Sequence, residues 1–125
     1  METKLLDYDE LLSICMSATR ANFRQRRCRY DSKLWVELEK EEQIHRSQFE
    51  GIISTASIYL GRHIWVSSDF HNLCVGIICK ERVSESSPKY PVYQGLVTEH
   101  EQKVKETLKI ANEGLQAIIT EGSKP

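Results

Sequence analysis

The sequence feature that most constrains the fold is a regular spacing of side chains between residues 35 and 59. Its members recur alternately at three and four residues: Trp35, Leu38, Glu42, His45, Phe49, Ile52, Ala56 and Tyr59. An α-helix has about 3.6 residues per turn, so this spacing places all of them on one helical face. Asp31-Ser32 offers an N-cap before the pattern, and Gly61 offers a C-terminal stop. We therefore predict a long helix that ends near Gly61.

Similar spacings predict three further amphipathic helices. One covers residues 8 to 28, after Asp7 as N-cap, and its apolar residues are Leu11, Leu12, Cys15 and Ala18. A second covers residues 69 to 83 through Phe70, Leu73, Cys74, Ile77 and Ile78. The last follows Tyr93, Val97, His100, Val104, Leu108, Ala111, Leu115 and Ile118 and stops at Gly122.

Two segments interrupt the helical pattern, and a third is ambiguous. The helix over residues 8 to 28 and the one after it do not share a stripe, so we predict a break near Tyr30. "SESSPKYP", residues 84 to 91, carries two prolines and is predicted to be a loop. The β-branched run around Gly76 leaves open a strand paired with residues 64 to 66.

Together these elements predict an all-α protein. A chain of 125 residues has the length of one domain and buries a core without disulfides or metals. We expect residues 1 to 125 to form a single-domain antiparallel helical bundle of three to four amphipathic helices, mostly up-down-up-down. Two helices longer than the others leave apolar surface uncovered, which favours self-association or a protein partner.

Composition narrows the environment of the chain. The formal net charge is −1 and 28% of residues are charged, so no global field favours nucleic acid or a membrane. No apolar run approaches the ~20 residues that span a bilayer, and the acidic N-terminal segment does not resemble a signal peptide. We expect the four cysteines, Cys15, Cys28, Cys74 and Cys79, to be reduced thiols. We therefore expect the protein to be cytoplasmic or nuclear.

The most distinctive local composition is an arginine-rich segment over residues 20 to 33. Six basic residues stand against Asp31, a local charge of +5. Planar guanidinium groups suit phosphate and carboxylate, so this segment is a candidate site for an anionic partner. Its candidate residues are Arg20, Arg24, Arg26, Arg27 and Arg29.

Two observations bear on what these arginines do. Residues 37 to 50 carry a local charge of −3, and antiparallel packing would set them opposite the arginines as an intramolecular charge match. Arg26 and Arg29 fall on the helical face that Leu11 and Cys15 bury. Either the helix has left the core by then, or these two side chains point at something.

Histidine and cysteine patterns raise two metal hypotheses. Glu42-x-x-His45 has the spacing of bundle metal sites, and His100 occupies a matching position on the last helix. A di-iron site needs a second Glu-x-x-His pair, which the chain lacks, so structural histidines are the favoured interpretation. A zinc set of His63, His71, Cys74 and Cys79 is disfavoured, because Cys74 and Cys79 diverge around a helix. We expect no metal or cofactor.

No catalytic motif appears: there is no glycine-rich phosphate loop and no nucleophile elbow. We therefore expect a non-enzymatic protein-interaction or adaptor subunit that uses its long helices to associate with a partner or with itself. One alternative is a metal-dependent helical-bundle enzyme using Glu42, His45 and His100. A second alternative is nucleic-acid binding through the arginine-rich segment 20 to 33.

Overall fold

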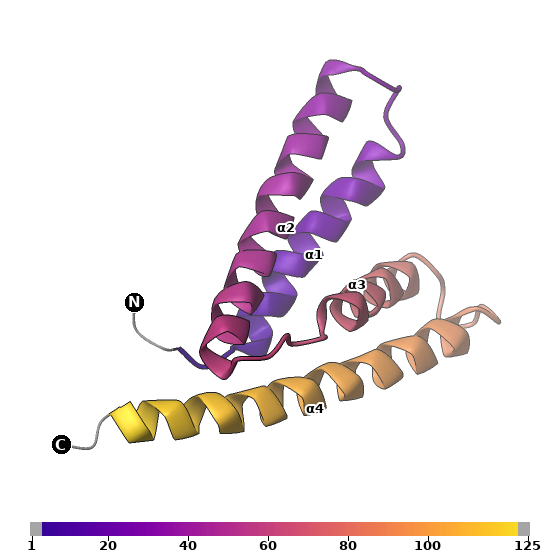
Figure 1. Cartoon of the computed structure of the whole chain (residues 1–125). Coiled ribbons are helices and arrows are strands. Elements are labelled where there is room, and N and C mark those ends of the chain that lie inside the picture. Colours follow the sequence, from indigo (N-terminus) through magenta and orange to yellow (C-terminus); the bar gives the residue numbers. More distant parts are fainter. Residues whose placement is uncertain (1–3, 123–125) are drawn as a thin grey trace.

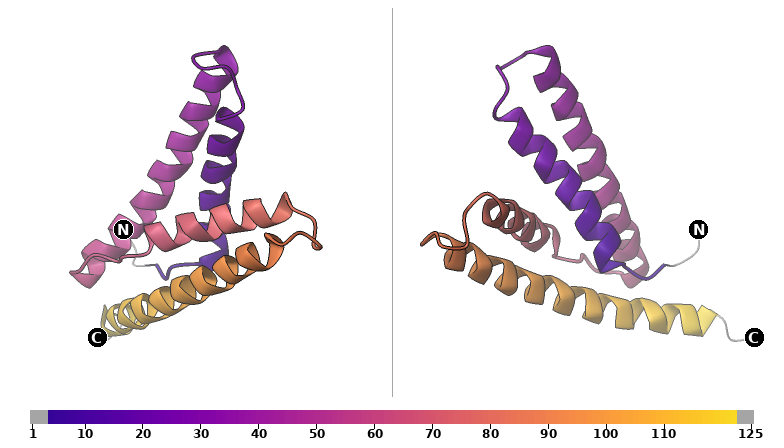
Figure 2. Two further views of the ribbon diagram at one scale, coloured as in Figure 1. Left: turned by 90° about the vertical axis from the view of Figure 1, so that its right-hand side faces the viewer. Right: turned by 180° about the vertical axis from the view of Figure 1, so that it is seen from behind.

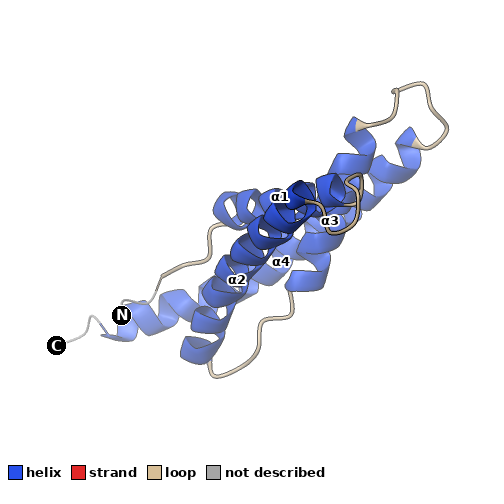
Figure 3. Cartoon of the chain, turned by 90° about the horizontal axis from the view of Figure 1, so that it is seen from above, coloured by secondary structure: helices blue, strands red, loops and turns tan. Residues whose placement is uncertain are grey.

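The computed structural model describes residues 4–122, which form four helices: α1 (Tyr8–Gln25), α2 (Lys33–Leu60), α3 (Ser67–Glu81) and α4 (Tyr90–Gly122). Regular structure within residues 4–122 is entirely helical, as Figure 3 shows. The predicted all-α bundle is confirmed. The alternative of a strand pair around Gly76 is wrong, since that residue lies inside α3.

The helices are arranged as two antiparallel hairpins, α1–α2 and α3–α4. The hairpins cross at a steep angle, so the turn between α1 and α2 projects away from α3 and α4 (Figures 1 and 2). The hairpins meet along α1 and α3 and, less extensively, along α2 and α4. The end of α2 approaches α4 so closely that a Cβ on Gly114 would lie 2.7 Å from Leu60 Cδ2.

The core lies where the two hairpins meet. Phe70 of α3 is fully buried there, with its ring centroid 5.2 Å from that of Phe49 and 6.1 Å from that of Tyr8. The contact with Phe49 is edge-on, an arrangement that stabilises packing beyond the apolar area it buries. Other fully buried members of this core are Leu11, Ile53, Ile64, Cys74, Val104 and Leu115.

Local signals place the helix ends. The Asp7 side chain accepts a hydrogen bond from the backbone N–H of Glu10 at 3.2 Å, and Ser32 accepts one from that of Trp35 at 3.2 Å. These caps satisfy N–H groups that have no partner within the helix. Gly61 ends α2 with φ of +70°, a conformation that glycine adopts without steric cost.

The segment before α1 is attached to α4 by one side chain. The Leu6 N–H donates to Asn112 Oδ1 at 2.7 Å, and Asn112 Nδ2 donates to the Leu6 carbonyl at 2.9 Å. This pair joins residues at opposite ends of the chain. It satisfies both backbone groups of a buried residue.

Two details of the second hairpin differ from a plain helical pattern. Gly76 lies where α3 meets α4, and a Cβ there would lie 3.2 Å from Val97 Cγ2. The predicted loop over residues 84 to 91 ends slightly early, because α4 begins at Tyr90 and includes Pro91. Proline is tolerated in a first helical turn, where its missing N–H would have had no partner.

Candidate functional site

The α1–α2 turn separates the two helices near the predicted position. α1 ends at Gln25 with Arg26 as C-cap, and Asp31 adopts a left-handed φ of 61° before Ser32 caps α2. The Gln25 side chain donates to the carbonyl of Trp35 at 3.3 Å and ties the two helix ends together. We call residues 24–35 the hairpin tip.

The hairpin tip carries five basic residues against Asp31, a local charge of +4. All five basic side chains, those of Arg24, Arg26, Arg27, Arg29 and Lys33, are exposed. Within the described residues, the side chains of Arg24, Arg27 and Arg29 form no ion pair, hydrogen bond or ring contact. Their charge is therefore not matched by an ion pair with any residue from 4 to 122.

The two remaining candidate arginines have partners. Arg20 lies one turn before the tip and binds Glu81 of α3 through two hydrogen bonds of 3.1 Å each. Arg26 lies over the Phe23 ring at 5.8 Å, and Arg82, the C-cap residue of α3, lies over the same ring at 4.9 Å. α1 ends at Gln25, which is still buried, so Arg26 and Arg29 lie beyond the helix and not on the face that Leu11 and Cys15 bury.

The charge match expected from the acidic block of α2 does not take the form of ion pairs. Glu42 pairs within its own helix with Arg46, at 2.6 Å, and accepts a hydrogen bond from Asn22 at 3.2 Å. Among residues 4–122, no ion pair joins an arginine of the segment 20 to 33 to that block. In the sequence, the first acidic residues after the tip are Glu37, Glu39 and Glu41, all on α2.

Apolar side chains accompany the charges at the hairpin tip. Tyr30 is 79% exposed, with its ring centroid 5.0 Å from that of Trp35 in an edge-on contact. Leu34 is 47% exposed on the first turn of α2. The sequence composition indicated that Tyr30 accompanies the arginines. It could not predict that Leu34 and Trp35 contribute to the same apolar surface, because that depends on how the turn folds.

The structure does not bring together the residues of the first metal hypothesis, which are Glu42, His45 and His100. Glu42 is bonded to Arg46, and His100 Nδ1 lies 3.0 Å from Asp69 Oδ1 of α3. In the part of the chain that the structure describes, no group of three His, Cys, Asp or Glu side chains could hold a metal ion. The partner of His100 was not predictable, because Asp69 and His100 lie far apart in sequence.

The proposed zinc ligands are also separated. His63 packs on the Trp65 ring at 4.2 Å between centroids, outside α3. Cys74 is fully buried, whereas Cys79 lines a cavity between α3 and α4 with Tyr93 and His100. These positions follow from the spacing on α3, which directs Cys74 and Cys79 to different sides.

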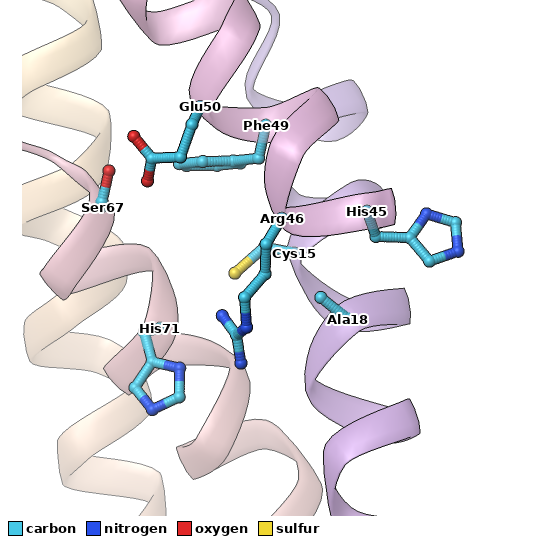
Figure 4. A pocket seen from close by; sticks show the side chains of 8 residues that line it. All are labelled: Cys15, Ala18, His45, Arg46, Phe49, Glu50, Ser67 and His71. Carbon is cyan, nitrogen blue, oxygen red and sulfur yellow. The ribbon is translucent and has the colours of Figure 1, made fainter. Parts of the chain in front are cut away.

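A small cavity lies between α1, α2 and α3, with a volume of about 120 Å³. Figure 4 shows its lining residues: Cys15, Ala18, His45, Arg46, Phe49, Glu50, Ser67 and His71. Burial, with a contribution from the charge of Arg46, lowers the pKa of His71 below its usual value. His45 Nδ1 is buried without a hydrogen-bond partner among the described residues.

No protein-family model matches the chain, and neither a curated protein nor a solved structure is significantly similar to it. None of the described helices combines the length and the apolar character needed to cross a membrane.

Proposed function

We propose that this chain is a non-enzymatic interaction subunit whose hairpin tip binds a short acidic segment of a protein partner. The observation that carries the proposal is the set of guanidinium groups of Arg24, Arg27 and Arg29, which have no partner among the described residues and lie at a hairpin tip that projects from the fold (Figure 1). Arginine presents a planar fork that matches a carboxylate in a bidentate geometry. Exposed, unpaired arginines are therefore available to a carboxylate-bearing partner.

The size of the basic surface favours a short peptide over nucleic acid. Glu37 and Glu41 follow Lys33 on α2 at about 6 and 12 Å along the helix axis, given a rise of 1.5 Å per residue. Duplex DNA carries one charge per about 1.7 Å of its axis, so a bound duplex would bring phosphates close to these carboxylates. A few acidic side chains on a peptide fit beside the tip without that repulsion.

The apolar part of the hairpin tip also supports a protein partner. Tyr30 and Leu34 are exposed beside the arginines, so a peptide can bury an apolar side chain while its carboxylates meet the guanidinium groups. Protein interfaces commonly combine aromatic and arginine side chains in this way. Tyr30 also has a face on which a base could stack, so binding of single-stranded RNA is the outcome that must be compared directly.

The test is a fluorescence-anisotropy titration with a labelled acidic peptide of about 12 residues that contains one aromatic side chain. We expect the wild type to bind it with an affinity that falls as salt is added. The variant Arg24→Ala/Arg27→Ala/Arg29→Ala should bind at least about tenfold more weakly. Since these exposed side chains make no hydrogen bond, ion pair or ring contact with the described residues, the variant should retain wild-type helical content and melting temperature.

The matched control is Lys103→Ala/Lys105→Ala/Lys109→Ala, which removes the same charge from exposed positions on α4. Its affinity for the peptide should stay within about twofold of wild type, because these lysines lie on α4, away from the hairpin tip. A non-specific attraction set by net charge would weaken equally in both variants. Equal losses in both variants, or no peptide binding by the wild type, would overturn the proposal. Tighter binding to an RNA of the same length would assign the tip to nucleic acid instead.

A further inference from the structure

Two guanidinium groups converge on one aromatic ring where the end of α3 meets α1. The Cζ atom of Arg82, the C-cap residue of α3, lies 4.9 Å from the centroid of the Phe23 ring, and that of Arg26 lies 5.8 Å from it. The face of an aromatic ring attracts cations, which holds both side chains near Phe23. Two positive charges so placed also repel each other, and an anion bound beside them would offset that repulsion.

Neither guanidinium group has an anionic partner among residues 4–122. Both arginines are exposed, and the side chain of neither one forms an ion pair or a hydrogen bond with a described residue. Glu81, which precedes Arg82 in the sequence, is instead bound to Arg20 by two hydrogen bonds of 3.1 Å each. The planar forks of Arg26 and Arg82 are therefore available to carboxylates from outside the chain.

This pair of arginines continues the basic surface of the hairpin tip. Arg26 belongs to the tip, and Phe23 directly precedes Arg24, the first residue of the tip. Arg82 comes from the other hairpin and extends the same surface onto the end of α3. An extended peptide of about 12 residues spans roughly 40 Å, which is long enough to contact the tip and Arg82 together.

We propose that the site for the partner's acidic segment continues from the hairpin tip onto the end of α3, where Arg26 and Arg82, both positioned by the Phe23 ring, bind acidic side chains of that segment. The inference rests on the proposed function of the tip and adds a second point of attachment for the same peptide. Arg82 contributes charge and a bidentate fork, and Phe23 is a positioning residue. The bound segment then contacts both hairpins.

Backbone amides at the end of α3 report on this contact. The Arg82 N–H donates to the Cys79 carbonyl at 3.2 Å, and the Val83 N–H donates to the Lys80 carbonyl at 3.4 Å. Helix ends open readily, so both amides should exchange rapidly with solvent in the free protein. A peptide bound to Arg82 slows that exchange, whereas a peptide bound to the tip alone does not.

The first experiment measures amide hydrogen exchange of the full-length protein with and without a saturating amount of the acidic peptide. We expect exchange at Arg82 and Val83 to slow at least about threefold when the peptide is bound. The matched control is the Arg62 amide, which donates to the Ser57 carbonyl at 3.2 Å at the end of α2. Its exchange should not change, because that end of α2 is the one remote from the tip.

The second experiment repeats the anisotropy titration of the same peptide with variants of Arg82. Arg82→Gln should weaken binding at least about fivefold, and Arg82→Lys should recover only part of the loss, because lysine keeps the charge without the fork. Arg62→Gln removes the same charge from an exposed position, and its affinity should stay within about twofold of wild type. Since the Arg82 side chain makes only a ring contact among the described residues, Arg82→Gln should keep wild-type helical content.

The role of the ring is measured separately with Phe23→Leu. This variant keeps the net charge and an apolar side chain but removes the ring that holds the two guanidinium groups. We expect it to bind the peptide at least about threefold more weakly, with unchanged helical content. Wild-type affinity in Phe23→Leu would overturn the positioning role of Phe23.

The outcomes separate this inference from the proposed function. If the wild type binds the peptide but Arg82→Gln binds it as tightly as Arg62→Gln, and the Arg82 and Val83 amides stay unprotected, the peptide is confined to the tip. That result overturns the inference and leaves the proposed function in place. Failure of the wild type to bind the peptide overturns both.

Discussion

Asn112→Ala tests whether one side chain fastens the N-terminal segment to α4. The substitution removes the bonds of 2.7 and 2.9 Å that Asn112 makes to the Leu6 N–H and carbonyl. A typical hydrogen bond contributes about 0.5–1.5 kcal/mol net, so the two together predict a loss of about 2 kcal/mol. The loss is larger if the backbone groups of buried Leu6 stay without water.

Urea unfolding followed by circular dichroism measures this loss. We expect a lower midpoint with an unchanged dependence on denaturant, and a melting temperature lower by roughly 8 °C for a chain of this size. Amide hydrogen exchange gives the local readout: the Leu6 N–H should be protected in the wild type and exposed in the variant.

The matched control is Gln116→Ala, one turn further along α4, whose amide bonds only Thr120 at 3.4 Å on the exposed side. Exposed substitutions of this kind change stability by no more than about 0.5 kcal/mol. Two results would contradict this role of Asn112: Asn112→Ala no more destabilising than Gln116→Ala, or a Leu6 amide that exchanges freely in the wild type.

Two further predictions concern glycine and tyrosine. Gly51→Ala, at an exposed position on α2, should raise the free energy of unfolding in urea by about 1 kcal/mol, because a Cβ there meets nothing within 4 Å. Gly76→Ala should raise it by less, since its Cβ would lie 3.2 Å from Val97 Cγ2. Burial and the neighbouring Glu101 carboxylate raise the pKa of Tyr8 to about 12, so its absorbance at alkaline pH should change later than that of a free tyrosine. Because the pKa of Tyr8 is higher in the folded state than the unfolded value of 10.0, its protonated phenol favours the folded state. This contribution to stability is present below pH 10.0 and is lost as the pH rises toward 12. Solvent screening limits this contribution to about 1 kcal/mol. It should be measurable as a difference in the free energy of unfolding between wild type and Tyr8→Phe that disappears as the pH rises from 10.0 to 12. A difference that persists over this pH range would contradict the raised pKa of Tyr8.

Periodicity predicted the helices because each buries one face. On α4, five residues of the predicted stripe are buried: Val97, Val104, Leu108, Ala111 and Leu115. On α2 the agreement is partial, since Ile53 rather than Ile52 is fully buried. A strict alternation of three and four has a period of 3.5, whereas a straight helix turns every 3.6 residues, so the buried face drifts along a long helix.

The angle between the hairpins was not predictable from periodicity. A stripe shows that a helix buries one face, but not which helix covers it. The first half of α2 packs on α1 beyond the reach of α4, so Glu42 and His45 continue the spacing without entering a four-helix core. This is why the hypothesis of a site shared with His100 failed, although all three residues lie on their predicted helices.

The same geometry separates the hairpin tip from the core. Near the tip, α1 meets α3 through Arg20 and Glu81, whose side chains are 49% and 48% exposed. A pair this exposed adds less than about 1 kcal/mol, so the angle between the hairpins depends mainly on the core around Phe70 and Cys74. Glu81→Gln, which breaks this pair, should therefore change the free energy of unfolding in urea by less than about 1 kcal/mol. A larger loss would mean that the exposed pair, and not the core, sets the angle between the hairpins.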